Sequence, residues 1–309
     1  MDTFIQQLIN GLVLGSMYAL VALGYTMVYG VLNLINFAHG DVLMIGAMAG
    51  LTILKILNSV APDLPGYVKL GIAIAGAIPV CMLVNVIIER VAYRRLRNAP
   101  RLAPLITAIG ISILLQTFAM MIWGRSPLPF PQLLSSEPIK LGGALISQTQ
   151  LLLLVLAAVS MIALVLLVEK TKIGRAMRAT SENPRIAGLM GVDSNKVIVA
   201  TFAIGAALAA VAGVMWGANY ASIQFAMGFM PGLKAFSAAV LGGIGNIYGA
   251  MIGGILLGII ESLGAGYIGD LTGGFLGSHY QDIFAFVVLI IVLTIRPSGI
   301  MGERVADRA

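Results

Sequence analysis

The amino-acid sequence predicts an all-α polytopic integral membrane protein with about eight to nine transmembrane helices. Of its 309 residues, 59% are hydrophobic and only 10% are charged, and the mean hydropathy is +0.97. Soluble domains carry about 25% charged residues. A chain this apolar is expected to cross a bilayer several times, as a single transmembrane domain over residues 1–309.

Each span is justified by length and apolar content, since a transmembrane helix needs about 20 mainly apolar residues. The expected spans are Phe4–Val28, Asp41–Leu57, Val68–Ile88, Leu102–Trp123, Gln150–Val168, Val197–Tyr220, Ala250–Gly264 and Ile283–Ile295. Two further apolar segments, near 30–41 and 232–247, contain glycine and are too short to cross alone. They are expected to be broken or re-entrant, with Gly232–Gly245 as a short inward pass.

The distribution of Lys and Arg residues indicates the topology. Residues 90–101, 170–196 and 296–308 hold 14 of the 19 Lys and Arg residues. The positive-inside rule places these three segments on the cytoplasmic side. Threading the spans between them puts the N-terminus outside and the C-terminus in the cytoplasm. The net charge of +6 is therefore explained by membrane topology, and no nucleic-acid partner is expected.

The two short segments are the predicted substrate path. Broken helices in transporters often line the path, because irregular backbone at membrane depth must face protein or a water-filled cavity. The polar and glycine residues expected there are Asn33, Asn36, His39, Asp41, Gly242, Gly243 and Asn246. Asp41 also suits the capped start of a broken helix. Glu261 is expected near a helix end, at the membrane interface.

Small residues recur at every fourth position in two spans: Gly205, Ala209, Gly213 and Gly217, and then Gly245, Gly249 and Gly253. Such spacing lets helix backbones approach closely, so these residues are expected to serve packing. The longest expected external loop is Gly124–Thr149, in which four prolines limit flexibility.

The longest polar interruption, Lys170–Lys196, contains a well-marked helix signal. Asn183 can cap the helix, Pro184 suits its first position, and Gly191 suits a left-handed stop. An apolar face follows, formed by Ile186, Ala187, Leu189 and Met190. A basic cytoplasmic loop with such a helix is expected to receive a docking partner.

The same loop resembles the coupling loop of ABC-importer permeases. More closely, the sequence GRAMRATSENPRIAGLMGVDSNKVIVATFAIGAALAAVAG is similar to the LivH-type permeases for branched-chain amino acids, as are NFAHGDVLMIGA and AFSAAVLGGIGNIYGAMIGG. The resemblance covers the chain from Asn10 to about Arg296. It implies that the loop inserts into a groove on an ATPase subunit. The coupling residues it implies are Glu182, Asn183, Pro184, Arg185, Ala187, Gly188 and Gly191.

The resemblance further implies the transport partners and the location. These are two ATP-binding cassette subunits, a second homologous, LivM-like permease and a periplasmic substrate-binding protein, in the bacterial inner membrane. The implied cargo is leucine, isoleucine or valine. Permeases for urea or short-chain amides are closely similar, so that substrate class stays open.

The residue inventory argues against an enzyme. The two histidines, His39 and His279, begin no metal-ligand motif, and Cys81 is the single cysteine. No lysine follows a glycine, so a P-loop is absent and ATP hydrolysis must reside on another chain. No cofactor or metal is expected. A stand-alone secondary transporter is the competing class, but no ladder of ionisable residues across the membrane supports proton coupling.

Overall fold

The computed structural model describes residues 2–97, 99–100, 102–134, 138–141, 143–271 and 281–302. Arg101, Glu137, His279, Arg304 and Arg308 lie outside this part of the chain. The long helices are α1 (Asp2–Leu32), α2 (His39–Val60), α3 (Gly66–Ile88), α5 (Leu102–Trp123), α6 (Gln148–Lys170), α9 (Ser194–Tyr220) and α11 (Ile247–Leu271). The shorter helices are the π-helix η1 (Glu89–Tyr93), α4 (Arg94–Leu96), α7 (Lys172–Glu182), α8 (Pro184–Leu189), α10 (Phe229–Gly242) and α12 (Gln281–Ile295).

The helical membrane architecture predicted from composition is confirmed. Within the described residues, seven helices are long and apolar enough to cross a membrane, and two shorter apolar helices lie in α10 and α12. Most predicted boundaries were too narrow. The first span continues to Leu32, and the span predicted over Ala250–Gly264 extends over Ile247–Leu271.

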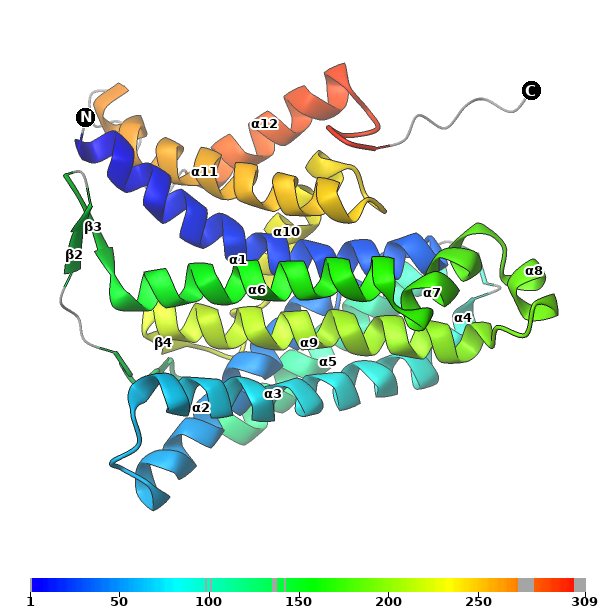
Figure 1. Ribbon diagram of the computed structural model, residues 1–309, viewed down its shortest axis with the longest axis horizontal. Coiled ribbons are helices and arrows are strands. Elements are labelled where there is room, and N and C mark those ends of the chain that lie inside the picture. The colour runs from blue at the N-terminus through cyan, green and yellow to red at the C-terminus, as the bar shows by residue number, and fades with distance from the viewer. Residues whose placement is uncertain are drawn as a thin grey trace.

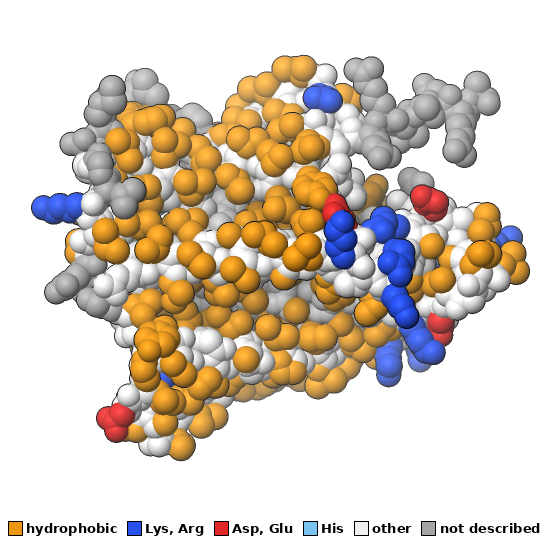
Figure 2. Space-filling view, viewed as in Figure 1, with side chains coloured by type: hydrophobic (Ala, Val, Ile, Leu, Met, Phe, Trp, Pro, Cys, Tyr) orange, Lys and Arg blue, Asp and Glu red, His pale blue; other side chains and the backbone are white. Residues whose placement is uncertain are grey.

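The two ends of the helix bundle differ in structure and charge. One end carries the start of α1 and two short strand pairs, β1 (Leu128–Pro129) with β4 (Ser222–Ile223) and β2 (Pro138–Leu141) with β3 (Ala144–Ser147) (Figure 1). The other end carries α4, α7 and α8. In Figure 2 the Lys and Arg side chains gather near α7 and α8, and the flank of the long helices is mainly hydrophobic. This segregation is what the positive-inside rule predicts.

Glycines bring the central helices into backbone contact. A Cβ on Gly11 of α1 would lie 2.7 Å from the Ile259 Cα of α11, and one on Gly15 would lie 2.8 Å from the Ile255 Cα. Side chains therefore cannot be added along this crossing without moving a helix. Gly213, one of the predicted packing glycines, likewise lies against the backbone of α2 at Ala47. Packing is confirmed as its role.

The two helix interruptions meet inside the bundle. The first is the irregular segment 33–38, after which α2 begins at His39. The second lies before Phe229, where the short helix α10 begins; α10 ends at Gly242, and another break follows it within the segment predicted near 232–247. A Cβ on Gly40 would lie 2.5 Å from the Gly228 carbonyl oxygen and 2.8 Å from the Gly232 Cα. The starts of α2 and α10 thus touch through glycine backbone.

Candidate functional site: a docking helix and a broken-helix junction

The helix predicted within Lys170–Lys196 is present as α8, and its ends have the predicted chemistry. The Asn183 side-chain oxygen accepts hydrogen bonds from the backbone N–H groups of Arg185 at 3.0 Å and Ile186 at 3.2 Å. Pro184 occupies the first turn. Gly191 follows the helix with φ +84°, a conformation that favours glycine.

This short helix presents apolar side chains to its surroundings. Leu189 is 87% exposed and Met190 is 81% exposed. Ala187 is buried, and its carbonyl accepts a hydrogen bond from the Val192 N–H at 3.0 Å. The Ser194 hydroxyl donates to the Pro184 carbonyl at 3.2 Å. The helix is therefore tied to the start of α9 on one side and offers a small hydrophobic surface on the other.

The preceding helix α7 was not predicted from the sequence. Thr171 caps it by accepting from the Gly174 N–H at 3.1 Å, and Met177 and Thr180 are buried. Gly174 lies directly against the Val168 backbone, and the Arg178 guanidinium donates to the Val168 carbonyl. The signal missed in the sequence was Thr171, which can cap a helix, followed by Gly174, Met177 and Thr180 at three-residue spacing. Through these contacts α7 fixes α8 to the end of α6.

The predicted coupling residues differ in their exposure to solvent. Ala187 is buried, whereas the others are exposed: Glu182, Asn183, Pro184, Arg185, Gly188 and Gly191. A Cβ on Gly188 would meet no atom within 4 Å. The chain's own packing therefore leaves room for a side chain at Gly188.

Asn36 organises the first interruption. Its side-chain oxygen accepts from the Ala38 N–H at 3.2 Å and from the Tyr93 hydroxyl at 3.0 Å. Its amide donates to Asn85 at 3.4 Å, and Asn85 donates to the Phe202 carbonyl at 2.7 Å. These buried bonds join the break to α3, η1 and α9. Because buried polar groups are costly unless paired, this network fixes the path of segment 33–38.

Asp41 does not cap α2, contrary to the prediction. The helix begins two residues earlier, after Ala38, and no side chain caps it. The Asp41 carboxylate instead accepts from the Ser112 hydroxyl at 2.5 Å and the Gln116 amide at 3.0 Å. Asp41 therefore joins the broken-helix junction to α5.

His39 is fully buried at the junction. Its ring lies 5.0 Å from the Tyr25 ring; a Cβ at Gly24 would collide with the imidazole, and one at Gly205 would lie 3.6 Å from its Cε1 atom. Neither ring nitrogen has a hydrogen-bond partner within the described part of the chain. An unpaired buried imidazole is energetically costly, which marks His39 as a candidate functional residue.

The other predicted path residues lie elsewhere. Gly242, Gly243 and Asn246 surround the far end of α10, about 20 Å along the helix from Phe229. There the Asn246 amide donates to the Met301 carbonyl at 3.0 Å, and Gly243 has φ +108°. Asn33 is exposed and lines a cavity beside the first interruption. The structure thus brings Asn36, His39 and Asp41 together at the first interruption. Gly242, Gly243 and Asn246 lie at the other end of α10.

A buried charge cluster was missed. The Lys234 ammonium lies 2.6 Å from the carboxylates of both Glu261 and Asp282, and the Tyr18 hydroxyl donates to Glu261 at 3.0 Å. Glu261 is 2% exposed, and the expectation that it lies near a helix end was wrong. The span continues well beyond Glu261 to Leu271. Lys234, a lone cation within an apolar segment, was the available signal.

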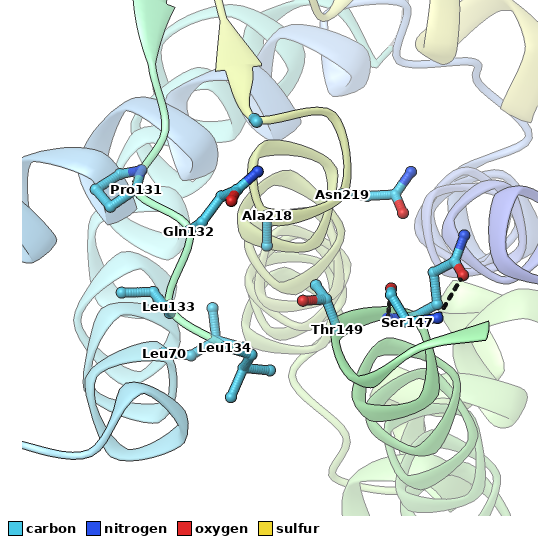
Figure 3. A pocket seen from close by; sticks show the side chains of 11 residues that line it. Leu70, Pro131, Gln132, Leu133, Leu134, Ser147, Thr149, Ala218 and Asn219 are labelled. Carbon is cyan, nitrogen blue, oxygen red and sulfur yellow. Dashed lines mark hydrogen bonds between the residues drawn. The ribbon is translucent and has the colours of Figure 1, made fainter. Parts of the chain in front are cut away.

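A second cavity, of about 180 Å³, lies at the end of the bundle opposite α8. Figure 3 shows Gln132, Thr149 and Asn219 around it, from three separate segments, with Leu133 and Leu134 on another side. Ser147 caps α6 here by accepting from the Gln150 N–H at 3.1 Å. The lining is uncharged. Among the described residues no group of three His, Cys, Asp or Glu side chains could hold a metal ion.

Comparison with known proteins gives a consistent result. Residues 7–293 match the family described as branched-chain amino acid transport system / permease component. The chain is 45% identical over 304 residues to a high-affinity branched-chain amino acid transport system permease protein, BraD, of Pseudomonas aeruginosa, covering 97% of this chain and 96% of the relative. It is 43% identical to the corresponding protein LivH of Escherichia coli, with the same coverage.

A more distant relative extends the comparison to another organism. The chain is 30% identical over 311 residues to a probable branched-chain amino acid transport permease protein, LivH, of Methanocaldococcus jannaschii, covering 95% of this chain and 91% of the relative. These relatives are named as transport permeases, in agreement with the prediction that the chain is not an enzyme. The chain belongs to the family of branched-chain amino acid transport system permease components.

Proposed function

We propose that this chain is the permease subunit of an ATP-driven, high-affinity importer for leucine, isoleucine and valine. The observation that carries the proposal is the family match together with the exposed docking helix α8 at the basic end. On this proposal, residues 1–309 form one transmembrane permease domain that supplies half of the translocation path. Segment 170–196 is its coupling loop.

Coupling requires that a partner's motion reach the membrane helices. The exposed Leu189 and Met190 side chains give an ATPase a hydrophobic anchor, and Arg185 adds a charged contact. Ala187 and Ser194 attach α8 to α9, and Arg178 attaches α7 to α6. A displacement of α8 is therefore transmitted to two long helices. Two ATP-binding cassette subunits supply the hydrolysis for which this sequence lacks a P-loop.

Membership of a permease family implies ATPase and substrate-binding-protein partners, and the finer composition is part of the proposal. A second, LivM-like permease completes the path, and a periplasmic binding protein delivers the amino acid. The complex lies in the bacterial inner membrane with the α4, α7 and α8 end and the C-terminus in the cytoplasm. The basic side chains near α7 and α8 support this orientation (Figure 2).

The proposed path includes Asn33, Asn36, His39 and Asp41. The unpaired buried imidazole and the interrupted helix support this assignment. Gly242, Gly243 and Asn246 are proposed to act at its cytoplasmic end, where the positive φ of Gly243 gives the chain a turn between α10 and α11. Their contact with substrate depends on movement, since Asn246 is bonded to Met301 here.

The test is co-purification of the ATPase subunits with wild type and with Gly188→Arg. Because a Cβ at Gly188 would meet no atom within 4 Å, and the position is exposed, the variant is expected to fold and insert normally. It is expected to lose the ATPases, because the long charged side chain occupies the docking surface. Gln148→Arg, an exposed position at the opposite end, is the matched control and is expected to retain them.

Retention of the ATPases by Gly188→Arg contradicts the coupling role of the loop. Uptake by the complete complex then separates the competing functions. The importer takes up leucine with ATP and is insensitive to a proton ionophore, whereas a stand-alone secondary transporter shows the reverse. If the complex takes up urea or a short-chain amide and does not take up leucine, the chain is assigned to that substrate class.

A further inference from the structure

A large cavity lies directly beside the first helix interruption. Its volume is about 520 Å³, and it is lined from α1, from segment 33–38 and from the start of α5. Tyr29 and Asn33 contribute a hydroxyl and an amide, while the remaining lining side chains, such as Leu34, Phe37 and Leu105, are apolar. An apolar wall with few polar groups suits a small amphipathic ligand.

The backbone beside this cavity is irregular inside the bundle. Segment 33–38 leaves α1 at Leu32, yet His39 at its end lies against Gly24. Eight residues of helix separate Gly24 from Leu32, a rise of about 12 Å. The break therefore returns about two turns along α1, to the level of Gly24. Irregular backbone at such depth occurs beside protein or a water-filled cavity, and not beside lipid.

Aromatic rings connect the cavity wall to the junction of α2 and α10. The Phe37 ring, which lines the cavity, lies 5.3 Å from the Phe236 ring of α10. Phe236 lies 6.0 Å from Tyr25, and Tyr25 lies 5.0 Å from His39. The rings form a continuous series of contacts from the cavity wall to the unpaired imidazole.

The face of α10 that carries Phe236 is left open by this chain. Phe229, Leu233, Phe236 and Val240 follow helical spacing and are exposed or half-buried, with Phe229 at 52%. The opposite face is buried against the other helices. Phe229 lies at the start of α10, next to the interrupted backbone, and Phe236 contacts the rings of Phe37 and Tyr25.

Resting on the proposed import function, we propose that Phe37 and Phe236 form the cytoplasmic gate of the substrate path. The cavity behind Phe37 is the inner vestibule, and its leucine-rich wall receives the branched apolar side chain of the transported amino acid. Rotation of the two rings, or movement of α10 relative to the first break, opens the gate.

The test uses thiol reporters in the complete transporter, assembled in inside-out vesicles. Cys81 is the chain's single cysteine and is buried, so a Cys81→Ala background leaves this subunit without a thiol. A charged methanethiosulfonate reagent is added at the cytoplasmic face. Leu105→Cys reports on the vestibule, and Ile106→Cys, its 68% exposed neighbour outside the lining, is the matched control.

Leucine is expected to slow labelling at Leu105→Cys about fivefold when its concentration is about four times its Kd. Labelling at Ile106→Cys is expected not to respond. Equal labelling at Leu105→Cys with and without leucine overturns the vestibule.

The gate is tested with a reporter on its outward side, Phe229→Cys at the start of α10. Phe236→Ala is expected to raise the labelling rate of this reporter from the cytoplasmic face by about tenfold, through a lower access barrier. Phe118→Ala, a 53% exposed phenylalanine on α5, is the control and is expected to leave the rate unchanged. An unchanged rate in Phe236→Ala overturns the gate. Should that variant not assemble, Phe37→Ala tests the same pair.

These outcomes are distinguishable from failure of the proposed function. ATP-driven leucine uptake by the wild-type complex is measured first. If leucine is not taken up, the import proposal fails on its own, while the gate measurement uses no substrate and still decides whether Phe37 and Phe236 close the path.

Discussion

The Lys234 ammonium and the Glu261 carboxylate lie 2.6 Å apart and join two helices, α10 and α11, at buried positions. Asp282 of α12 approaches the same ammonium at 2.6 Å. Charges within a membrane protein are costly unless paired, so this cluster holds the half-length helix α10 in a defined position. That position is also the one at which Gly232 meets Gly40.

Replacing Lys234 by methionine is expected to destabilise the protein strongly. It leaves two carboxylates without their buried counter-ion, a change that costs about 3–5 kcal/mol in buried pairs. The double variant Lys234→Met/Glu261→Gln is expected to recover part of that loss. Thermal unfolding in detergent measures both, with Lys55→Met at an exposed position as control. Equal unfolding temperatures for Lys234→Met and wild type contradict a stabilising cluster.

Adding a methyl group at Gly24 is expected to destabilise the broken-helix junction. A Cβ there would lie 2.6 Å from the His39 Cε1 atom and still closer to Nε2. Overpacking of this kind costs about 1–3 kcal/mol. Gly24→Ala is therefore expected to unfold at lower temperature, and His39→Ala in the same chain to restore stability. Gly71→Ala, where nothing lies within 4 Å, is the control. If His39→Ala does not restore the stability of Gly24→Ala, the loss of stability does not come from contact with the His39 ring.

Removing the Asn183 cap is expected to fray the docking helix. Its side chain satisfies two backbone N–H groups, and loss of such a cap costs about 0.5–2 kcal/mol. Because α8 is exposed, the membrane bundle should keep its stability in Asn183→Ala while ATPase binding weakens. Asn183→Asp retains an accepting oxygen and is expected to bind normally. Binding is measured by titrating purified ATPase onto immobilised permease, and equal affinity for both variants rejects the capping role.

The exposed Leu189 side chain is expected to anchor the ATPase. At 87% exposure it contributes little to this chain's own fold. Leu189→Asp is therefore expected to leave thermal stability unchanged and to weaken ATPase binding by about 2 kcal/mol or more, the range of an interface anchor. Leu189→Met preserves an apolar side chain and serves as control. Unaltered affinity in Leu189→Asp would move the anchor to another part of the loop.

The order of the spans and the helix α8 could be predicted from the sequence because both depend on local chemistry. Apolar length identifies α5 and α6, and Asn183, Pro184 and Gly191 mark the two ends of α8 within a few residues of one another. The α7 helix escaped prediction because its apolar positions are few and its surface is strongly basic. Packing against α6 stabilises α7, and this contact cannot be predicted from the spacing of residues within α7.

The sequence by itself determined an all-helical membrane protein with a basic end and a short capped helix at Pro184–Leu189, since hydrophobicity, charge and capping act over a few residues. Only the tertiary structure decided that Gly40 meets Gly232, that Lys234 neutralises Glu261 and that the Phe37 ring lies 5.3 Å from the Phe236 ring. Each of these pairs joins residues far apart in the chain. Their contact depends on how the two interrupted helices fold back into the bundle, because backbone approach at glycine and burial of charge are properties of the assembled helices.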